Sequence, residues 1–453
     1  MVSMRNVMAL LGAALLVGCT QLDPYRVEAD HPPGLDGRLP EQPPFSLDRS
    51  RECGSAGNDC VQFVEYDEFG NAFSREQLQA GVSAAEAVAE NGGAVIVYVH
   101  GWHHSASPGD GDIKHFHSIV SQASEHSGKG AVGIYVGWRG DSIDAENALF
   151  GWSSYVLTFW DRKSTAHTVG HGGGVSELIR KLSDIRAKNK ESSLMVIGHS
   201  FGGAILYSAV SQILAEQIRL DSASGEKSFV KKDFRSVADL VVLANPAFEA
   251  MRMAPLYALA RSYEYPPDLP PRLVVVTTTA DWATRYAFPG GRHLGTLFQR
   301  YPEGPSRALN TTAIGHYVPY VTHQLTAGKC DDRQEGSNSL ADEGGDSLLE
   351  ALNKPASSCF PGHNDAASVV LTRCDVRGDC RYVVDEHYLA RGPAVEGYIP
   401  KRFPIANVRT DATVIGDHND IWNPTMSNFL FGLLVAAMQD PGAIPMVPAL
   451  SVE

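Results

Sequence analysis

The sequence predicts an α/β protein in which a mostly parallel sheet carries helices on both faces. The first observation is a series of short apolar runs, of which Ala94-Val95-Ile96-Val97-Tyr98-Val99 is the clearest. Unbroken, β-branched runs of this kind are typical of strands that are buried on both faces. The second observation is that stretches of helical composition separate these runs. Alternating strands and helices form parallel sheets, because the chain must cross back before each new strand begins.

The expected elements follow one another along the chain. Strands are expected at 61–66, 94–99, 131–136, 194–197, 240–243, 273–276, 405–408 and 412–415. Helices are expected at 74–90, 113–126, 164–188, 201–219, 249–261 and 423–438. From Cys330 to about Arg391 the chain is polar and shows no β/α alternation. We interpret this segment as a surface insertion, and as a candidate lid, ahead of the last strand.

Composition limits the class of protein. With 43% hydrophobic and 20% charged residues, the chain of 453 residues is neither largely disordered nor fibrous. Its 52 acidic and 38 basic residues give a net charge of −14, which argues against nucleic acid as the main partner, because that partner needs a basic surface. The expected divisions are a signal peptide (1–18), a proline-rich tether (19–58), an α/β core in two parts (59–329 and 401–440), a Cys-rich acidic insertion (330–400) and a tail (441–453).

The amino terminus resembles that of an exported bacterial lipoprotein. An apolar run over 7–17 is too short to cross a bilayer comfortably and is typical of a signal peptide. It ends at Leu16-Val17-Gly18-Cys19, which resembles a lipobox. The resemblance implies acyl chains on Cys19 and a membrane anchor at the bacterial cell envelope. In such lipoproteins, an aspartate directly after the cysteine is the usual signal for retention in the inner membrane. This chain has Thr20 at that position, which favours the outer membrane. The alternative is an uncleaved apolar anchor with an incidental cysteine.

The chain has seven cysteines, an odd number. If Cys19 carries lipid, six remain, and an exported protein keeps such cysteines as disulfides. Several pairings are open to six cysteines. Proximity in the sequence favours the pairs Cys53–Cys60, Cys374–Cys380 and Cys330–Cys359. None of the spacings is CxxC, so no metal site is expected.

Ser200 is the candidate nucleophile. It lies in Gly198-His199-Ser200-Phe201-Gly202, a G-x-S-x-G string between the strand expected at 194–197 and the helix expected at 201–219. This strand–turn–helix context is that of a nucleophile elbow, in which a strained turn projects the hydroxyl at the carboxyl end of the strand. The start of the helix also favours developing negative charge. The alternative is a glycine-rich turn that performs no chemistry.

A second motif lies upstream, where His100-Gly101-Trp102-His103 follows the strand expected at 94–99. It resembles the oxyanion loop of α/β-hydrolases. In that superfamily, the oxyanion hole combines one N–H group from this loop with one from the residue after the serine. The resemblance therefore assigns these donors to Trp102 and Phe201. Taken together, the two motifs identify the chain as similar to the α/β-hydrolase superfamily over about 61–326 and 403–438.

A serine nucleophile needs a base, and the base needs an orienting carboxylate. In this superfamily the chain order is serine, acid, histidine. Asp281 follows the strand expected at 273–276 and is the candidate acid, although such a carboxylate can also cap a helix. His418 is the favoured base, because it comes after the last expected strand and before the last helix. His316 is the alternative, but no clear strand precedes it.

The resemblance implies a serine hydrolase, above all one that cleaves carboxylic esters through an acyl-enzyme. Thioester or amide cleavage would use the same residues. No cofactor is implied, and the partner would be a small-molecule or lipid acyl ester. Trp138-Arg139-Gly140 and Phe159-Trp160-Asp161-Arg162 are similar to motifs of bacterial hydrolases whose substrate is undefined. The alternative from another class is a non-catalytic envelope protein that keeps the fold as a binding scaffold. Acyl chain length and oligomeric state stay open.

Overall fold

A computed structural model describes much of the chain. The described residues are 24–27, 46–54, 57, 59–140, 152–223, 237–265, 271–301, 304–328, 358–360, 369–374 and 403–438. The expected signal peptide, the tail, and Cys19, Cys330 and Cys380 lie outside them, as do most of the expected tether and insertion.

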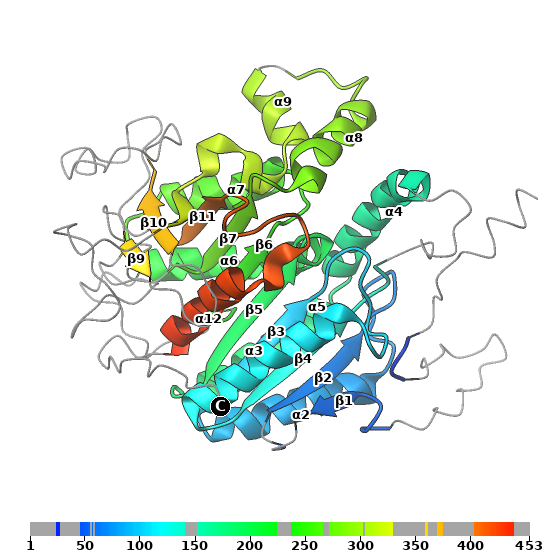
Figure 1. The fold of residues 1–453 in the computed structure, drawn as a ribbon, viewed down its shortest axis with the longest axis vertical. Helices are drawn as coiled ribbons and strands as arrows, with labels where there is room; N and C mark the ends of the chain where they lie inside the picture. The colour runs from blue at the N-terminus through cyan, green and yellow to red at the C-terminus, as the bar shows by residue number, and fades with distance from the viewer. Residues whose placement is uncertain are drawn as a thin grey trace, which may run out of the picture.

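A single sheet runs through the described part of the chain, with the strand order β1-β2-β4-β3-β5-β6-β7-β11-β8-β10-β9 (Figure 1). From β2 to β8 every neighbouring pair is parallel. Antiparallel pairing is confined to β1 at one edge and to β10 and β9 at the other. The strands are β1 Arg51–Cys53, β2 Asp59–Glu65, β3 Ala94–Val99, β4 Ala131–Gly137, β5 Ser193–His199, β6 Leu240–Ala244, β7 Leu273–Thr278, β8 His323–Ala327, β9 Ser358–Phe360, β10 Val369–Arg373 and β11 Ile405–Thr410.

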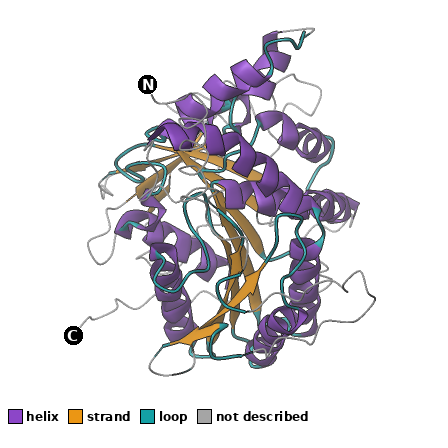
Figure 2. Cartoon of the chain, turned by 90° about the vertical axis from the view of Figure 1, so that its right-hand side faces the viewer, coloured by secondary structure: helices purple, strands orange, loops and turns teal. Residues whose placement is uncertain are grey.

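Helices cover both faces of this sheet (Figure 2). They are α2 Arg75–Glu90, α3 Gly111–Ser127, α4 Trp152–His171, α5 Gly174–Lys188, α6 Phe201–Ala223, α7 Ala250–Arg261, α8 Phe288–Gly295, α9 Gly304–Thr311 and α12 Pro424–Met438. The fold class expected from the sequence, a mostly parallel sheet between two helical layers, is therefore confirmed. Among the described helices, none is both long and apolar enough to cross a bilayer.

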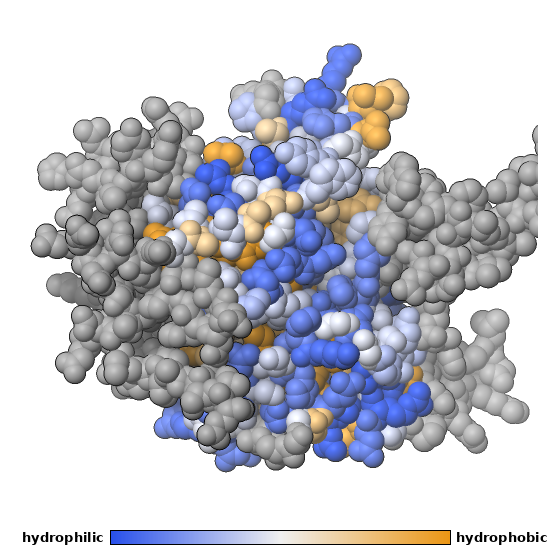
Figure 3. All heavy atoms as spheres, viewed as in Figure 1, coloured by the Kyte–Doolittle hydropathy of each residue, from blue (hydrophilic) through white to orange (hydrophobic). Residues whose placement is uncertain are grey.

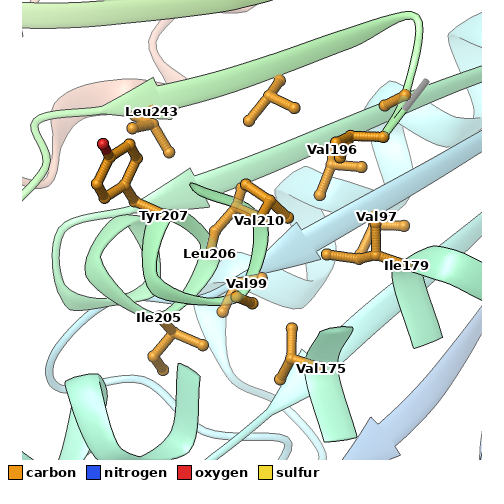
Figure 4. Packing of buried hydrophobic residues seen from close by; sticks show 14 of the residues in the cluster. Val97, Val99, Val175, Ile179, Val196, Ile205, Leu206, Tyr207, Val210 and Leu243 are labelled. Atoms are coloured by element: carbon orange, nitrogen blue, oxygen red, sulfur yellow. The ribbon is translucent and has the colours of Figure 1, made fainter. Parts of the chain in front are cut away.

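Strand β3 shows why the sheet is buried on both faces. Successive side chains of a strand point to opposite faces, and both sets are apolar here. Val97 and Val99 enter one core with α5 and α6, where Figure 4 shows them near Val175 and Leu206. The alternate residues of the same strand, such as Ile96, enter a second core with α3 and α12. An unbroken apolar run is thus needed to fill two layers.

Two expected elements are corrected. The helix expected at 164–188 is two helices, α4 and α5, because Gly173 between them has a φ of 93°, which a continuous right-handed helix does not allow. The strand expected at 412–415 is a turn. There the Asp411 carboxylate accepts a hydrogen bond from the Thr413 N–H at 2.9 Å and folds the chain back directly after β11.

At both edges, the sheet contains strands that the apolar pattern of the sequence does not predict. Strand β1 lies in the expected tether, whereas β9 and β10 lie in the expected insertion and extend the sheet beyond β8.

The disulfide predicted between Cys53 and Cys60 is confirmed, and it joins residues that face each other across β1 and β2. Cys374 is also disulfide-bonded. The pairings of Cys330, Cys359, Cys374 and Cys380 stay predictions.

Candidate active site

Ser200 occupies the turn between β5 and α6, at the carboxyl end of the sheet. Its φ of 54° lies in the left-handed region, which non-glycine residues seldom adopt and which costs conformational free energy. Backbone hydrogen bonds hold the turn in this conformation. The Ser200 N–H donates to the Ala244 carbonyl at 3.0 Å, and the Ser200 carbonyl accepts from the Ala247 N–H at 3.1 Å. The strained turn that the G-x-S-x-G string predicts is therefore present.

The glycines of the two motifs allow the serine turn and the upstream loop to touch. A Cβ atom on Gly202 would collide with the carbonyl oxygens of Val99 and His100. A Cβ atom on Gly101 would lie 3.0 Å from the Cβ of Ser200. Only glycine leaves room for this approach of one backbone to the other. The His100-Gly101-Trp102 loop consequently lies directly against the candidate nucleophile.

Replacing Gly202 with alanine tests the importance of this packing. Because the colliding atoms are backbone carbonyls, they cannot turn aside, and we expect Gly202→Ala to lower the free energy of unfolding by about 3 kcal/mol. Urea unfolding measures the change. Gly111→Ala is the matched control, because a Cβ there meets nothing within 4 Å, and it should change stability by less than about 1 kcal/mol. Equal effects of the two substitutions would contradict this account.

Three side chains from distant parts of the chain form one hydrogen-bonded chain. The His418 Nε2 atom lies 2.7 Å from the Ser200 Oγ, and the His418 Nδ1 atom lies 2.7 Å from the Asp281 Oδ2. Asp281 follows β7 and His418 follows β11, which pair in parallel with their ends aligned at Thr278 and Thr410. The expected candidates thus come together at one edge of the sheet. With Asp281 ionised, Nδ1–H donates to the carboxylate and Nε2 can accept the Ser200 hydroxyl proton.

Asp281 stays ionised although its side chain is fully buried. Burial by itself raises the pKa of this carboxyl group. The attraction of His418 and the hydrogen bonds from His418 and Thr284 outweigh that effect and lower the pKa to about 2. Thr284 donates twice, through its N–H at 2.9 Å to Oδ1 and through its hydroxyl to Oδ2. Asp281 can therefore hold the imidazole of His418 in one tautomer throughout the neutral range.

His316, the alternative base, lies behind the acid rather than beside the serine. Its Nε2 atom is 2.9 Å from the hydroxyl oxygen of Thr284. Since that hydroxyl donates to Asp281, His316 must donate to Thr284 through Nε2–H. Burial lowers the pKa of His316 to about 4, so the ring is neutral at neutral pH. His316 thus supports the carboxylate through Thr284, while His418 contacts both Ser200 and Asp281.

Asn245 and His199 hold the loop that carries His418, a role that the sequence pattern assigns to neither residue. The His418 carbonyl oxygen accepts from the Asn245 side-chain amide and from His199 Nε2–H, each at 2.9 Å. Asn245 directly follows β6 and has a φ of 42°, a conformation that asparagine tolerates better than most residues. An Asn-Pro pair immediately after a buried strand is the only signal in the sequence that could have pointed to it.

His100 positions the expected oxyanion loop. Its Nε2 accepts from the Trp138 N–H at 3.1 Å, and its Nδ1–H donates to the Gly101 carbonyl at 2.9 Å. The indole N–H of Trp138 donates to the His100 carbonyl. The Trp102 ring lies 6.0 Å from the ring of Phe201, centre to centre. The side chains of the two residues expected to supply oxyanion donors are therefore neighbours.

Buried histidines make stability depend on pH. Burial lowers the pKa values of His100 and His316 to about 4, and of His167 and His199 to about 3. Below about pH 6.5, the unfolded chain binds protons at these sites that the folded chain does not bind, so stability falls as pH falls. We expect each histidine to remove about 1.4 kcal/mol between about pH 7.5 and pH 5.5. Urea unfolding at both pH values measures the loss, and an unchanged midpoint would contradict the expectation.

The chain has no match among protein-family models and none among curated proteins. Among solved structures, an uncharacterized protein from Pseudomonas aeruginosa matches with a TM-score of 0.20 and 9% sequence identity, over 49% of this chain and 41% of that one. This chain therefore spans less than half the length of that protein, and so weak a similarity supports no conclusion about this chain.

Within the described ranges, no three His, Cys, Asp or Glu side chains gather as a metal site would require.

Proposed function

We propose that the protein is a serine hydrolase of the α/β-hydrolase superfamily. The observation that carries the proposal is the hydrogen-bonded chain from Asp281 through His418 to Ser200, with Ser200 in a strained turn after a parallel strand. The chain order of serine, acid and histidine is that of the superfamily. The mostly parallel sheet between two helical layers supports the same assignment.

The proposed reaction begins when Ser200 Oγ attacks an acyl carbonyl carbon while His418 Nε2 takes the hydroxyl proton. Negative charge develops on the carbonyl oxygen, and the N–H groups of Trp102 and Phe201 are the proposed donors to it. As the tetrahedral intermediate collapses, His418 passes the proton to the leaving alcohol and the acyl-enzyme remains. Water, deprotonated by His418, then attacks the acyl carbon. As the bond to Ser200 Oγ breaks, His418 returns the proton to that oxygen and the acid leaves. Asp281 stays ionised and stabilises the imidazolium that forms in each step.

Carboxylic esters are the proposed substrates, and thioesters and amides are the alternatives that the same residues could cleave. The second class of function, a binding scaffold without catalysis, would not need a hydrogen bond between His418 and Ser200. The cell-envelope location and the lipid anchor on Cys19 remain proposals that rest on the amino-terminal sequence. Labelling of cells with a palmitate analogue tests them, and the label should be lost in Cys19→Ala.

A series of p-nitrophenyl esters with increasing acyl length tests the proposed function. We expect turnover with kcat on the order of 1 s⁻¹ or more for the preferred ester, and a peak of kcat/KM at one acyl length. Matched thioester and anilide substrates distinguish the alternatives. A folded protein that turns over none of these substrates would overturn the proposal and favour the binding scaffold.

A further inference from the structure

A cavity of about 620 Å³ lies beside α4, away from the hydrogen-bonded chain of the candidate active site. Residues of α4, α7 and α8 and the residue preceding α7 contribute to its wall, and none of Ser200, Asp281 and His418 lines it. The lining residues that matter here are Trp160, Lys163, His167, Glu249, Arg252 and Arg292. We refer to it below as the α4 cavity.

Three cationic side chains of the α4 cavity share one carboxylate. The Glu249 side chain accepts from Lys163 Nζ at 2.7 Å and from Arg252 Nε at 2.9 Å, and it lies 3.0 Å from Arg292 Nε. Burial raises the pKa of Glu249, but the charge and hydrogen bond of Lys163, together with the charge of Arg292, outweigh burial and lower the pKa to about 2. Glu249 therefore balances one of three positive charges. Two positive charges are left over, in a chain whose net charge is −14.

Hydrogen-bond donors of the α4 cavity also remain unused among the described residues. Arg252 uses only its Nε toward Glu249, although a guanidinium carries five N–H donors. His167 is 7% exposed, and its Nε2 atom is buried without a hydrogen-bond partner. Its Nδ1 atom lies 3.0 Å from the Ser208 hydroxyl, which can donate to it. With Nδ1 accepting, the neutral ring carries its proton on Nε2, which makes no hydrogen bond although His167 lines the cavity.

We propose that the α4 cavity binds the phosphate monoester group of a ligand. Such a group carries close to two negative charges at pH 7 and has three acceptor oxygens, which matches two excess charges and several unused donors. Arginine is well suited to phosphate because its donors form a rigid fork. The cavity is larger than a phosphate group, so an organic portion of the ligand can enter with it.

The ligand would lie close to the candidate active site. The Trp160 ring in the cavity wall lies 5.0 Å from the ring of Phe159, and Phe159 lies 5.3 Å from Trp102 and 5.0 Å from Phe201, between ring centres. A single aromatic side chain therefore separates the cavity wall from the residues expected to hold the oxyanion. Binding in the cavity can thus influence the candidate active site, although the binding proposal does not depend on catalysis.

The phosphate could belong to a soluble metabolite or to a lipid headgroup. Just after Arg292, the chain exposes Leu294, Leu297 and Phe298, whose exposed fractions are 77%, 66% and 96%. Figure 3 shows apolar atoms gathered at the end of the molecule where α8 and α9 lie. An acyl chain attached to the phosphate could contact these residues. Inorganic phosphate, glycerol 3-phosphate and a short-chain phosphatidic acid are therefore the probes that separate the two sources.

Isothermal titration calorimetry of the full chain with these three probes at about pH 7.5 tests the proposal. The ligand controls are glycerol, which is neutral, and succinate, which is a dicarboxylate dianion. We expect glycerol 3-phosphate to bind, and to bind at least about tenfold more tightly than succinate. Tighter binding of phosphatidic acid than of glycerol 3-phosphate would identify the lipid source, and equal binding the soluble one. No binding of any phosphate compound at about 10 mM, or equal binding of succinate, would overturn the proposal.

Two substitutions with opposite expected effects tie the binding to the α4 cavity. Arg252→Gln should weaken binding of glycerol 3-phosphate by about tenfold, because it removes a charged donor. Glu249→Gln should tighten binding, because it removes the competing anion. Arg180→Gln is the control, since it removes the same charge from an exposed position on α5 and should leave the affinity unchanged. If Arg180→Gln and Arg252→Gln weaken binding equally in folded protein, the site is not the α4 cavity.

Discussion

Replacing Ser200 with alanine is expected to lower kcat/KM for model esters by at least about 10⁴-fold. The substitution removes the hydroxyl oxygen that lies 2.7 Å from His418 Nε2. Without it no acyl-enzyme can form, and the remaining rate would come from water bound near the proposed oxyanion donors. The turn itself should persist, because backbone hydrogen bonds from Ala247 and to Ala244 hold it.

Steady-state kinetics with the preferred p-nitrophenyl ester measures this loss. Ser83→Ala is the matched control, because Ser83 is exposed on α2 and remote from the site. Circular dichroism and urea unfolding establish that both variants are folded. A folded Ser200→Ala protein that keeps more than about a tenth of the wild-type kcat/KM would mean that Ser200 is not the nucleophile.

The second large effect separates the two candidate histidines. His418→Ala should reduce kcat/KM by about 10³-fold to 10⁴-fold, because it removes both the proton acceptor for Ser200 and the partner of Asp281. His316→Ala should reduce it by less than about tenfold, or 1.4 kcal/mol. His316 reaches Asp281 only through Thr284, and Asp281 would keep its hydrogen bonds from His418 and from the Thr284 N–H.

The same ester assay compares the two variants, with urea unfolding as the check on folding. Because His316 is buried and neutral, its loss should not alter the pH profile of kcat/KM in the neutral range. The assignment is wrong if His316→Ala abolishes turnover while His418→Ala spares it, in stably folded proteins.

The sequence predicts the arrangement of Ser200, Asp281 and His418 because each follows a strand of the parallel part of the sheet. The carboxyl ends of such strands meet at one edge, so side chains far apart in the chain come together there. The G-x-S-x-G string adds the strained turn, because glycines at fixed positions leave room for close backbone approach. Local pattern and parallel topology are thus enough to single out Ser200 and Asp281. His418 is expected directly after a strand at 412–415, but that segment is a turn, and His418 follows β11 through this turn.

Such patterns do not identify the residues that hold Asp281 and His418 in position. Thr284 follows Asp281 by three residues and looks like an ordinary helix residue, and Asn245 looks like part of an ordinary loop. Their partners, His316 and the His418 carbonyl, come from other parts of the chain. Only the three-dimensional arrangement reveals these contacts, because nothing in the local sequence encodes a partner across the sheet edge.

The edge strands are missed for a different reason. Strands β1 and β9, at the two edges, are only three residues long. Strand β8, which lies between β11 and β10, is also missed, because its sequence His323-Gln324-Leu325-Thr326-Ala327 has little apolar character. Edge strands are buried less than central ones, so they do not need an unbroken apolar run. The α4 cavity escapes prediction as well, since its cations come from three separate helices and gather only around the buried carboxylate of Glu249.

The most direct test of the central claim is to map the adduct formed with a fluorophosphonate. Ser200 Oγ should attack the phosphorus atom and form an O–P bond while fluoride leaves, with His418 taking the hydroxyl proton. Peptide mass spectrometry of the labelled, folded protein should then locate one adduct on Ser200, and labelling should vanish in Ser200→Ala. An adduct on another residue, or no adduct under conditions in which a known serine hydrolase reacts, would contradict the proposal that Asp281, His418 and Ser200 form a catalytic triad.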